Sequence, residues 1–236
     1  MITFDRPGYG VSDSREGRTV ADAAADVKVI ADALGIDRFA VAGRSGGGPH
    51  ALACAALLPA RTTRAASLVS LAPPDAVGLD WFRGMTESNV RAFKTAEKGR
   101  DAVADSLRPA ARKIQRDPAS KIQGLLQESP ESDRRTVSDA DIRRMLLRNF
   151  AEAFRGSADG WIDDVVAFSS DWSFDPGQIK VPTMIWHGEK DVYSPVAHAE
   201  WLGCRIPGAT LRIDSGVAHF GAIEVLPEVL NWLTRD

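Results

Sequence analysis

The chain has 236 residues, of which 44% are hydrophobic and 26% are charged, and its formal net charge is −3. This length and composition predict a soluble globular protein with one main domain and room for a substantial insertion. No apolar run approaches the roughly 18 to 20 residues that a membrane-spanning helix requires, so we expect no membrane segment. The N-terminus lacks the basic and apolar regions of a secretory signal, which makes the cytoplasm the expected location.

Charge and cysteine content argue against two further classes of protein. The acidic net charge gives no overall attraction to nucleic acid, and the longest basic cluster, residues 112–116, lies among acidic neighbours. The two cysteines, Cys54 and Cys204, are too few for a disulfide scaffold, and metal sites usually need more ligands at closer spacing. We therefore expect neither a nucleic-acid partner nor a metal site.

Strand and helix patterns alternate over residues 1–74. Helical periodicity predicts two helices, at residues 20–34 and 49–58. They lie between three short apolar runs that predict strands, at residues 2–4, 38–42 and 65–72. This alternation favours an α/β fold, in which a mostly parallel sheet carries helices on both faces.

The pattern changes between residues 75 and 170, where strand signals disappear and charged residues become frequent. A capping-box-like sequence at Ser138 predicts a helix that ends near Gly156. The alternation then resumes, with strands expected at residues 181–186 and 210–213 and helices at residues 195–202 and 223–233. The chain is thus predicted to be an α/β core, residues 1–74 and 171–236, interrupted by a helical insertion at residues 75–170.

The segment GRSGGG at residues 43–48 stands between a predicted strand and a predicted helix. Its glycine spacing fits neither a phosphate loop nor a dinucleotide fingerprint. It matches G-x-S-x-G, in which a serine occupies a sharp, strained turn and small neighbours let the strand and the helix approach closely. Ser45 is therefore a candidate nucleophile, and the alternative is a glycine-rich turn with an incidental serine.

A serine hydroxyl is a weak nucleophile unless a base removes its proton and a third group orients that base. Of the four histidines, His219 lies in a loop with small neighbours between the last strand and the last helix, which makes it the candidate base. We expect His50 to pack along its helix and His187 to be structural at a strand end. His198 is expected at the surface of its helix.

The candidate acid is Asp191, in the loop that follows the strand at residues 181–186. Two rivals, Asp75 and Asp214, are interpreted as turn residues. The chain order Ser45, Asp191, His219 is the order that one serine-hydrolase fold uses.

Four segments together resemble the α/β-hydrolase family: DRPGYGVSD at 5–13, GRSGGG at 43–48, IKVPTMIWHGEKDVYSP at 179–195 and GVAHF at 216–220. The resemblance implies that residues 75–170 form a cap over the active site. It implies the roles of nucleophile for Ser45, base for His219 and orienting acid for Asp191, and it makes the backbone N–H of Gly46 one oxyanion donor. Serine at position 45 disfavours the members of the family that use an aspartate nucleophile.

One family feature is missing from this chain. In the family, a strand that ends in His-Gly precedes the DRPGYG motif and lies between the strands that correspond to residues 2–4 and 38–42. The loop after it donates the second oxyanion N–H. Met1 stands after the place where that segment would end. Either the sequence is an N-terminally shortened version, or the strand at 2–4 pairs directly with the strand at 38–42 and another group completes the oxyanion hole.

The expected activity is hydrolysis of an ester or related acyl substrate through a Ser-His-Asp triad and an acyl-enzyme. The expected partner is a small acyl molecule, and no cofactor is implied, because the triad supplies nucleophile, base and electrostatics. The alternative is a catalytically weak or inert binding protein of the same fold, because part of the oxyanion hole is missing. Amide, lactone and carbon-carbon bonds also stay open as substrates. Aromatic residues in the insertion either line an acyl pocket or only pack: Trp81, Phe82, Phe150, Phe154 and Trp161.

Overall fold

The computed structural model describes residues 1–235 and divides the chain into two compact units. The sheet unit consists of residues 19–85 and the chain from Ser170 onward. The helical unit consists of residues 86–169 together with residues 1–18. The expectation of a core at 1–74 and 171–236 with a cap at 75–170 stays a prediction, and these compact units have different bounds.

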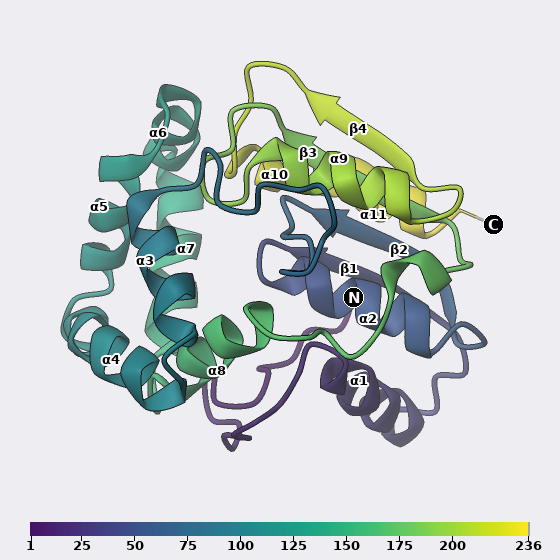
Figure 1. The fold of residues 1–236 in the computed structure, drawn as a ribbon, viewed down its shortest axis with the longest axis horizontal. Helices are drawn as coiled ribbons and strands as arrows, with labels where there is room; N and C mark the ends of the chain where they lie inside the picture. Colours follow the sequence, from purple (N-terminus) through teal and green to yellow (C-terminus); the bar gives the residue numbers. More distant parts are fainter. Residues whose placement is uncertain (236) are drawn as a thin grey trace. The chain divides into compact units, whose positions relative to one another are not determined.

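The sheet unit contains a four-stranded parallel sheet in the order β1-β2-β3-β4 (Figure 1). The strands are β1 (Phe39–Arg44), β2 (Thr62–Leu68), β3 (Thr183–Gly188) and β4 (Thr210–Asp214). Each neighbouring pair is parallel. This confirms the predicted α/β fold, and the boundaries of all four strands lie within a few residues of the expected ones.

Helices cover both faces of this sheet, as the alternation of strands and helices predicts. The helical segments are α1 (Asp22–Ala33), α2 (Gly47–Leu57), η1 (Pro176–Gln178), α9 (Val196–Arg205), α10 (Gly221–Glu224) and α11 (Leu226–Leu233). One core packs Ile185 of β3 against Leu52 of α2 and Leu202 of α9. The other packs Trp186, the next residue of β3, against Ala222 of α10 and Val229 of α11. Neighbouring residues of one strand thus enter opposite cores, because side chains alternate across a sheet.

The strand predicted at residues 2–4 is wrong, and of the two alternatives the one in which it pairs directly with residues 38–42 is therefore excluded. These residues form no strand, and Ile2 and Phe4 are 56% and 40% exposed. Within residues 1–235, β1 pairs with β2 alone. Three residues with exposed side chains bury too little apolar surface to offset the loss of backbone entropy on ordering.

The helical unit is built from six helices: α3 (Glu87–Ala96), α4 (Arg100–Arg116), α5 (Ala119–Glu128), α6 (Glu131–Ser138), α7 (Ala140–Ala153) and α8 (Asp159–Phe168). The predicted start of α7 at Ser138 is displaced by one residue, because the Asp139 side chain accepts the N–H groups of Asp141 and Ile142 and so caps the helix. Phe154 packs edge-on to Trp161 inside an apolar core that includes Ala111 of α4.

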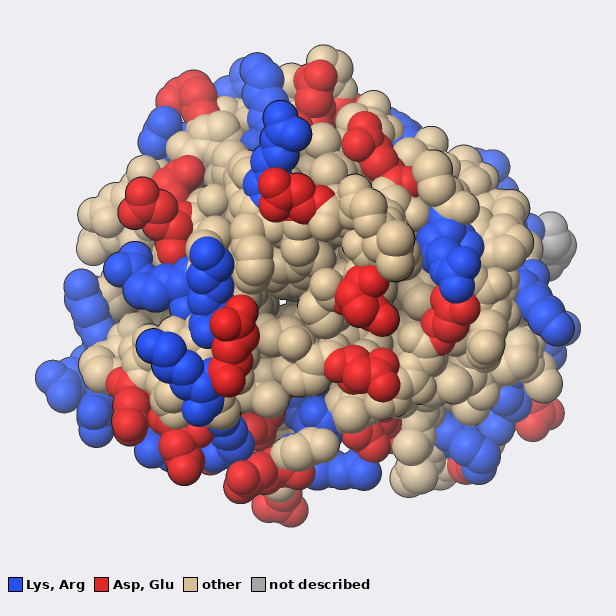
Figure 2. All heavy atoms as spheres, in the orientation of Figure 1, with Lys and Arg blue, Asp and Glu red and all other residues tan. Residues whose placement is uncertain are grey.

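Charged residues on the helical unit form exposed pairs one turn apart. Arg134 and Glu131 of α6 lie 3.2 Å apart, and Arg155 and Glu152 lie 3.4 Å apart. On the face in Figure 2, Lys and Arg side chains stand beside Asp and Glu side chains. Because exposed pairs contribute only about 0 to 1 kcal/mol each, the apolar core supplies most of the unit's stability. Among residues 1–235, no helix is both long and apolar enough to cross a membrane.

The DRPGYG segment docks on helix α8 within the helical unit. Asp164 of α8 pairs with Arg6 and, at 2.8 Å, with Arg18, and it accepts the Tyr9 hydroxyl at 2.8 Å. The Gly160 N–H donates to the carbonyl of Gly8 at 3.1 Å. A Cβ on Gly8, whose φ is +84°, would stand 2.4 Å from the Gly160 nitrogen. Glycine therefore allows the two backbones to touch at this place.

His198 lies inside the sheet unit, 1% exposed, and its predicted surface location is wrong. Its Nδ1 accepts the Ala72 N–H at 3.0 Å, and its Nε2 donates to the Trp81 carbonyl at 3.0 Å. The Trp81 indole in turn donates to the Ala72 carbonyl at 2.9 Å. The neutral ring thus ties the chain after β2 to helix α9, and burial lowers the pKa of His198 to about 4.

Two glycines of the GRSGGG segment differ in what surrounds them. A Cβ on Gly43 would stand 2.0 Å from the Gly47 carbonyl oxygen, whereas nothing lies within 4 Å of a Cβ on Gly47. We expect Gly43→Ala to destabilise the protein by about 2 kcal/mol or more, because the backbone at the start of α2 must shift. The control Gly47→Ala is expected to leave the stability unchanged or raise it by up to about 1 kcal/mol. Urea unfolding measures both, and equal losses would contradict this account of the turn.

The pH dependence of stability tests the burial of His198. The folded pKa of about 4 lies below the reference value of 6.5, so the unfolded chain binds a proton that the folded chain excludes. Stability is therefore lost as the pH falls from 6.5 toward 4, and between pH 7 and pH 5 this ring accounts for about 2 kcal/mol. We expect His198→Gln to flatten that part of the curve in urea unfolding at several pH values. An identical slope in the variant would contradict the assignment.

Candidate active site

Ser45 stands on a strained turn between β1 and α2. Its φ is +54°, a left-handed conformation that a residue with a Cβ seldom adopts. The Ser45 N–H donates to the Leu68 carbonyl at 2.8 Å, and the Ser45 carbonyl accepts the Gly48 N–H at 2.9 Å. A Cβ on Gly48 would stand 2.4 Å from Ser70 Oγ. The small residues that flank Ser45 therefore let the strand, the helix and the turn meet closely.

Parallel topology brings the other two candidate residues to the same edge of the sheet. Ser45 follows the carboxyl end of β1, Asp191 follows β3 and His219 follows β4. The Lys190 N–H donates to the carbonyl of Val217 at 2.8 Å, which joins the last two loops to each other. Three residues more than 20 positions apart in sequence thus reach one site.

The three side chains form a continuous hydrogen-bonded chain. His219 Nε2 lies 3.0 Å from Ser45 Oγ, and His219 Nδ1 lies 2.8 Å from Asp191 Oδ2. Because a carboxylate only accepts, Nδ1 carries the proton and Nε2 presents its lone pair to the serine hydroxyl. This is the arrangement in which an imidazole can remove the hydroxyl proton.

The Asp191 carboxylate is buried, at 4% exposure, and surrounded by donors. Its Oδ1 accepts the backbone N–H groups of Tyr193 at 2.8 Å and Ser194 at 3.1 Å. Burial alone would raise the pKa of the Asp191 carboxyl. The charge of His219 and the hydrogen bonds from His187 and His219 outweigh burial and hold the pKa well below its usual range. Asp191 therefore stays an anion inside the protein.

Side chains that the sequence patterns did not single out surround His219. The Tyr193 ring meets the imidazole edge-on, with centroids 5.1 Å apart. Arg44 donates to the His219 carbonyl at 3.2 Å and lies over the Phe220 ring at 5.2 Å. Arg44 is the variable residue before the serine in G-x-S-x-G, so only its contacts reveal that it holds the histidine loop.

Gly46 is the N-cap residue of α2, and it directly follows Ser45. The first N–H groups of a helix have no acceptor inside the helix, and the helix dipole makes this end electropositive. The Gly46 N–H thus belongs to the group of donors that can face an anion beside Ser45. Among residues 1–235, no cluster of three or more His, Cys, Asp or Glu side chains could hold a metal ion.

The other candidate residues have separate places in the sheet unit. Asp214 accepts the Trp186 indole N–H at 3.0 Å and pairs with Arg212 at 2.7 Å. His50 is buried and lies 3.3 Å from the Val20 carbonyl oxygen. Burial raises the pKa of the Cys54 thiol to about 12, as is typical of an unreactive core cysteine.

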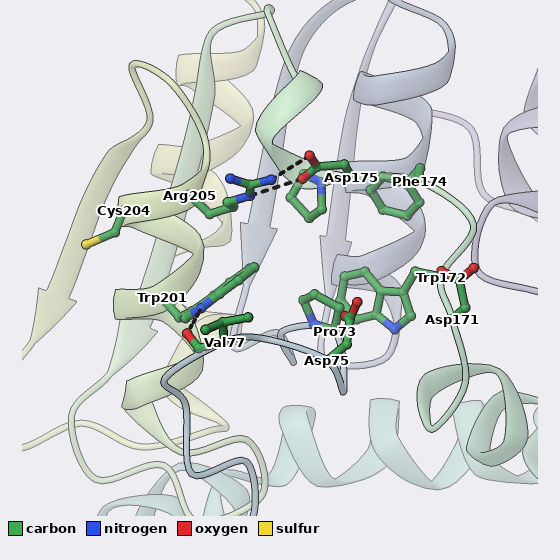
Figure 3. Close-up of a pocket in the computed structure, with 11 residues that line it drawn as sticks. Pro73, Asp75, Val77, Asp171, Trp172, Phe174, Asp175, Trp201, Cys204 and Arg205 are labelled. Carbon is green, nitrogen blue, oxygen red and sulfur yellow. Dashed lines mark hydrogen bonds and ion pairs between the residues drawn. The ribbon is translucent and has the colours of Figure 1, made fainter.

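Asp75 lines a cavity of about 790 Å³ that does not include Ser45, Asp191 or His219 (Figure 3). The cavity also contains the pair Arg205 and Asp175, 2.5 Å apart. Its other lining residues are Pro73, Val77, Asp171, Trp172, Phe174, Pro176, Trp201 and Cys204. The two rival acids, Asp75 and Asp214, thus have other places in the structure, and Asp191 is the carboxylate that contacts His219.

Comparison with known proteins places this geometry in a family. A family model described as the alpha/beta hydrolase fold matches residues 1–225. A non-heme chloroperoxidase from Streptomyces lividans is 30% identical over 235 residues, which cover 98% of this chain and 78% of the relative. A 2-hydroxy-6-oxo-6-phenylhexa-2,4-dienoate hydrolase from Burkholderia cepacia is 28% identical, with 100% of this chain and 76% of the relative covered.

A solved structure supports the same fold. A bromoperoxidase from Bacillus anthracis superposes with a TM-score of 0.67 at 19% identity, over 98% of this chain and 80% of that chain. Together with the family match over residues 1–225, this agreement extends to nearly the whole chain. The chain therefore belongs to the alpha/beta hydrolase fold family.

Proposed function

We propose that this protein is a serine hydrolase that cleaves an ester or a related acyl substrate through a covalent acyl-enzyme. One observation carries the proposal: Ser45 Oγ, on its strained turn, lies 3.0 Å from a histidine nitrogen whose other nitrogen is held by a buried carboxylate. A hydroxyl activated in this way is a nucleophile for acyl carbon.

In the first half of the reaction, Ser45 Oγ attacks the substrate carbonyl carbon while its proton passes to His219 Nε2. Asp191 stabilises the imidazolium that forms and keeps the ring in the required orientation, 2.8 Å from Nδ1. The carbonyl oxygen becomes an oxyanion, toward which the Gly46 N–H donates. When the tetrahedral intermediate collapses, His219 returns the proton to the leaving alcohol and the acyl group stays on Ser45.

In the second half, a water molecule takes the place of the alcohol. His219 Nε2 removes a proton from the water as the water oxygen attacks the acyl carbon. Collapse of the second intermediate releases the carboxylic acid and returns the proton to Ser45 Oγ. The triad thus ends the cycle in the state in which it began.

The names of the relatives cover several kinds of reaction. The named relatives include haloperoxidases, hydrolases of 2-hydroxy-6-oxo-dienoates and a pimeloyl-[acyl-carrier protein] methyl ester esterase. An activated serine suits the carbonyl groups of esters most directly, so we place short carboxylic esters first. The division into a core, residues 1–74 and 171–236, and a substrate-covering cap, residues 75–170, belongs to the same proposal.

Substitution of the serine tests the proposal. We expect Ser45→Ala to lower the turnover of a short p-nitrophenyl ester by at least about 1,000-fold, because the nucleophile is lost while the surrounding site remains. Wild-type protein should react stoichiometrically with a fluorophosphonate probe, and mass spectrometry of the labelled peptide should place the adduct on Ser45.

The control for this experiment is Ser215→Ala, which removes a hydroxyl that binds Glu189 at 2.8 Å on the surface. It should keep full turnover and full labelling. Equal turnover in Ser45→Ala and the wild type, or an absence of labelling in folded wild-type protein, would refute the proposed function.

A further inference from the structure

We propose that His187 is a positioning residue for the active site, whose Nε2–H group fixes the Asp191 carboxylate against His219. The inference deepens the proposed serine chemistry and rests on it for its kinetic consequence. The contact between the His187 imidazole and the Asp191 carboxylate does not depend on any substrate.

The contacts of His187 define which of its nitrogens carries the proton. His187 is fully buried, and its Nε2 lies 2.6 Å from the Ser194 carbonyl oxygen and 3.3 Å from Asp191 Oδ2. Both neighbours are acceptors, so Nε2 must be the donor. Nδ1 is buried with no hydrogen-bond partner in the part of the chain that the structure describes. A proton there would be an unpaired buried donor, so the ring adopts the Nε2–H form.

His187 presents a second imidazole N–H to Asp191 Oδ2, in addition to that of His219. The remaining side-chain neighbour is Ser194 Oγ, at 3.1 Å from Oδ2. That hydroxyl has one proton and a closer acceptor, the Val69 carbonyl oxygen at 2.7 Å. The single His187 Nε2–H proton also has a closer acceptor, the Ser194 carbonyl oxygen at 2.6 Å, so its contact with Oδ2 at 3.3 Å is the longer branch of a shared hydrogen bond, just as the 3.1 Å contact of Ser194 is the longer branch beside Val69.

The backbone at Val69 also contributes to the position of the loop that carries Asp191. Val69, which directly follows β2, is buried and has a φ of +45°, although it is β-branched. Such a conformation costs on the order of 1 to 3 kcal/mol and persists only where its surroundings enforce it. Here the strained residue presents the carbonyl that accepts Ser194 Oγ at 2.7 Å, so this hydrogen bond and the one from His187 to the Ser194 carbonyl both hold the loop that carries Asp191.

The consequence of this contact is electrostatic. A donor on Oδ2 disperses the negative charge of Asp191, and that charge is what stabilises protonated His219. Without His187, the less-stabilised carboxylate would hold the His219 proton more strongly. The base would then be protonated over a wider range of pH, and less of it would be ready to accept the Ser45 proton.

Few other titratable groups reach this site. His219 and His187 act on Asp191 through both charge and hydrogen bonds. His198, on α9, interacts through its charge with both His187 and Asp191. Arg44 contacts the backbone of His219, and the Tyr193 ring contacts its imidazole. His198→Gln is therefore the matched control, because it removes a buried histidine near the site that forms no hydrogen bond with Asp191.

The experiment follows the His219 ring by ¹⁵N NMR during a pH titration, which requires no turnover. The four histidines of the chain make assignment by single substitution practical. We expect His187→Leu to move the midpoint of the His219 titration upward by about 0.5 pH unit, since part of a charge-assisted hydrogen bond is lost. His187→Gln, which keeps an N–H donor, should restore most of the shift. His198→Gln should leave the midpoint in place.

A second measurement uses the wild-type protein alone, so it can be made even if His187→Leu does not fold. Long-range ¹H–¹⁵N spectra distinguish the two imidazole tautomers, and His187 should show the Nε2–H form. An Nδ1–H form would overturn the proposal. So would an unmoved His219 midpoint in folded His187→Leu, or an equal shift in His198→Gln.

Kinetics separate this inference from the proposed function. In an active enzyme, the acid limb of the kcat/KM profile should move upward in His187→Leu by the same amount as the NMR midpoint, and return in His187→Gln. An NMR shift in a protein whose Ser45 does not react with a fluorophosphonate would refute the hydrolase proposal and leave the positioning role intact. Labelling of Ser45 together with an unmoved His219 midpoint in His187→Leu would support the hydrolase proposal and refute the positioning role of His187.

Discussion

The buried carboxylate of Asp191 is the group on which the candidate active site depends. An anion at 4% exposure is costly unless donors compensate for lost water, and here two backbone N–H groups and two imidazoles do so. Those donors come from the Asp191 loop, from the end of β3 and from the loop after β4. The Asp191 carboxylate is compensated only when these three segments adopt their observed positions. His219, which binds Asp191, then holds its other nitrogen toward Ser45.

Sequence patterns identified the features that depend on local chemistry. G-x-S-x-G predicted a strained serine, because only small residues let β1 and α2 approach so closely, and the φ of Ser45 agrees. The parallel sheet followed from the alternation of strands and helices, and parallel strands bring residues after their carboxyl ends to one edge. The choice of Asp191 over Asp75 and Asp214 rests on motif resemblance as much as on position after a strand, and in the structure Asp191 contacts His219.

Local sequence patterns could not predict features that depend on how the chain folds back on itself. Residues 2–4 have a strand-like pattern but no neighbouring strand, and a pattern contains no information on pairing. His198 looks like a surface residue of an isolated helix, yet Ala72 and Trp81, more than 100 positions away, supply both of its hydrogen bonds. His187 lies only four positions before Asp191, and the sequence predicts a structural histidine there without showing that the loop after Gly188 turns back toward it.

The contact of the DRPGYG segment with α8 also limits which parts of the chain could be deleted or exchanged. Because residues 1–18 belong to the helical unit, the backbone passes between the two units at three places: 18/19, 85/86 and 169/170. The helical unit is consequently not an insertion that can be removed in one piece. Replacing residues 86–169 by a short linker would take away Asp164 and leave Arg6, Arg18 and Tyr9 without the carboxylate that compensates their burial. An exchange of residues 86–169 with the matching region of a relative would therefore have to include the first 18 residues as well.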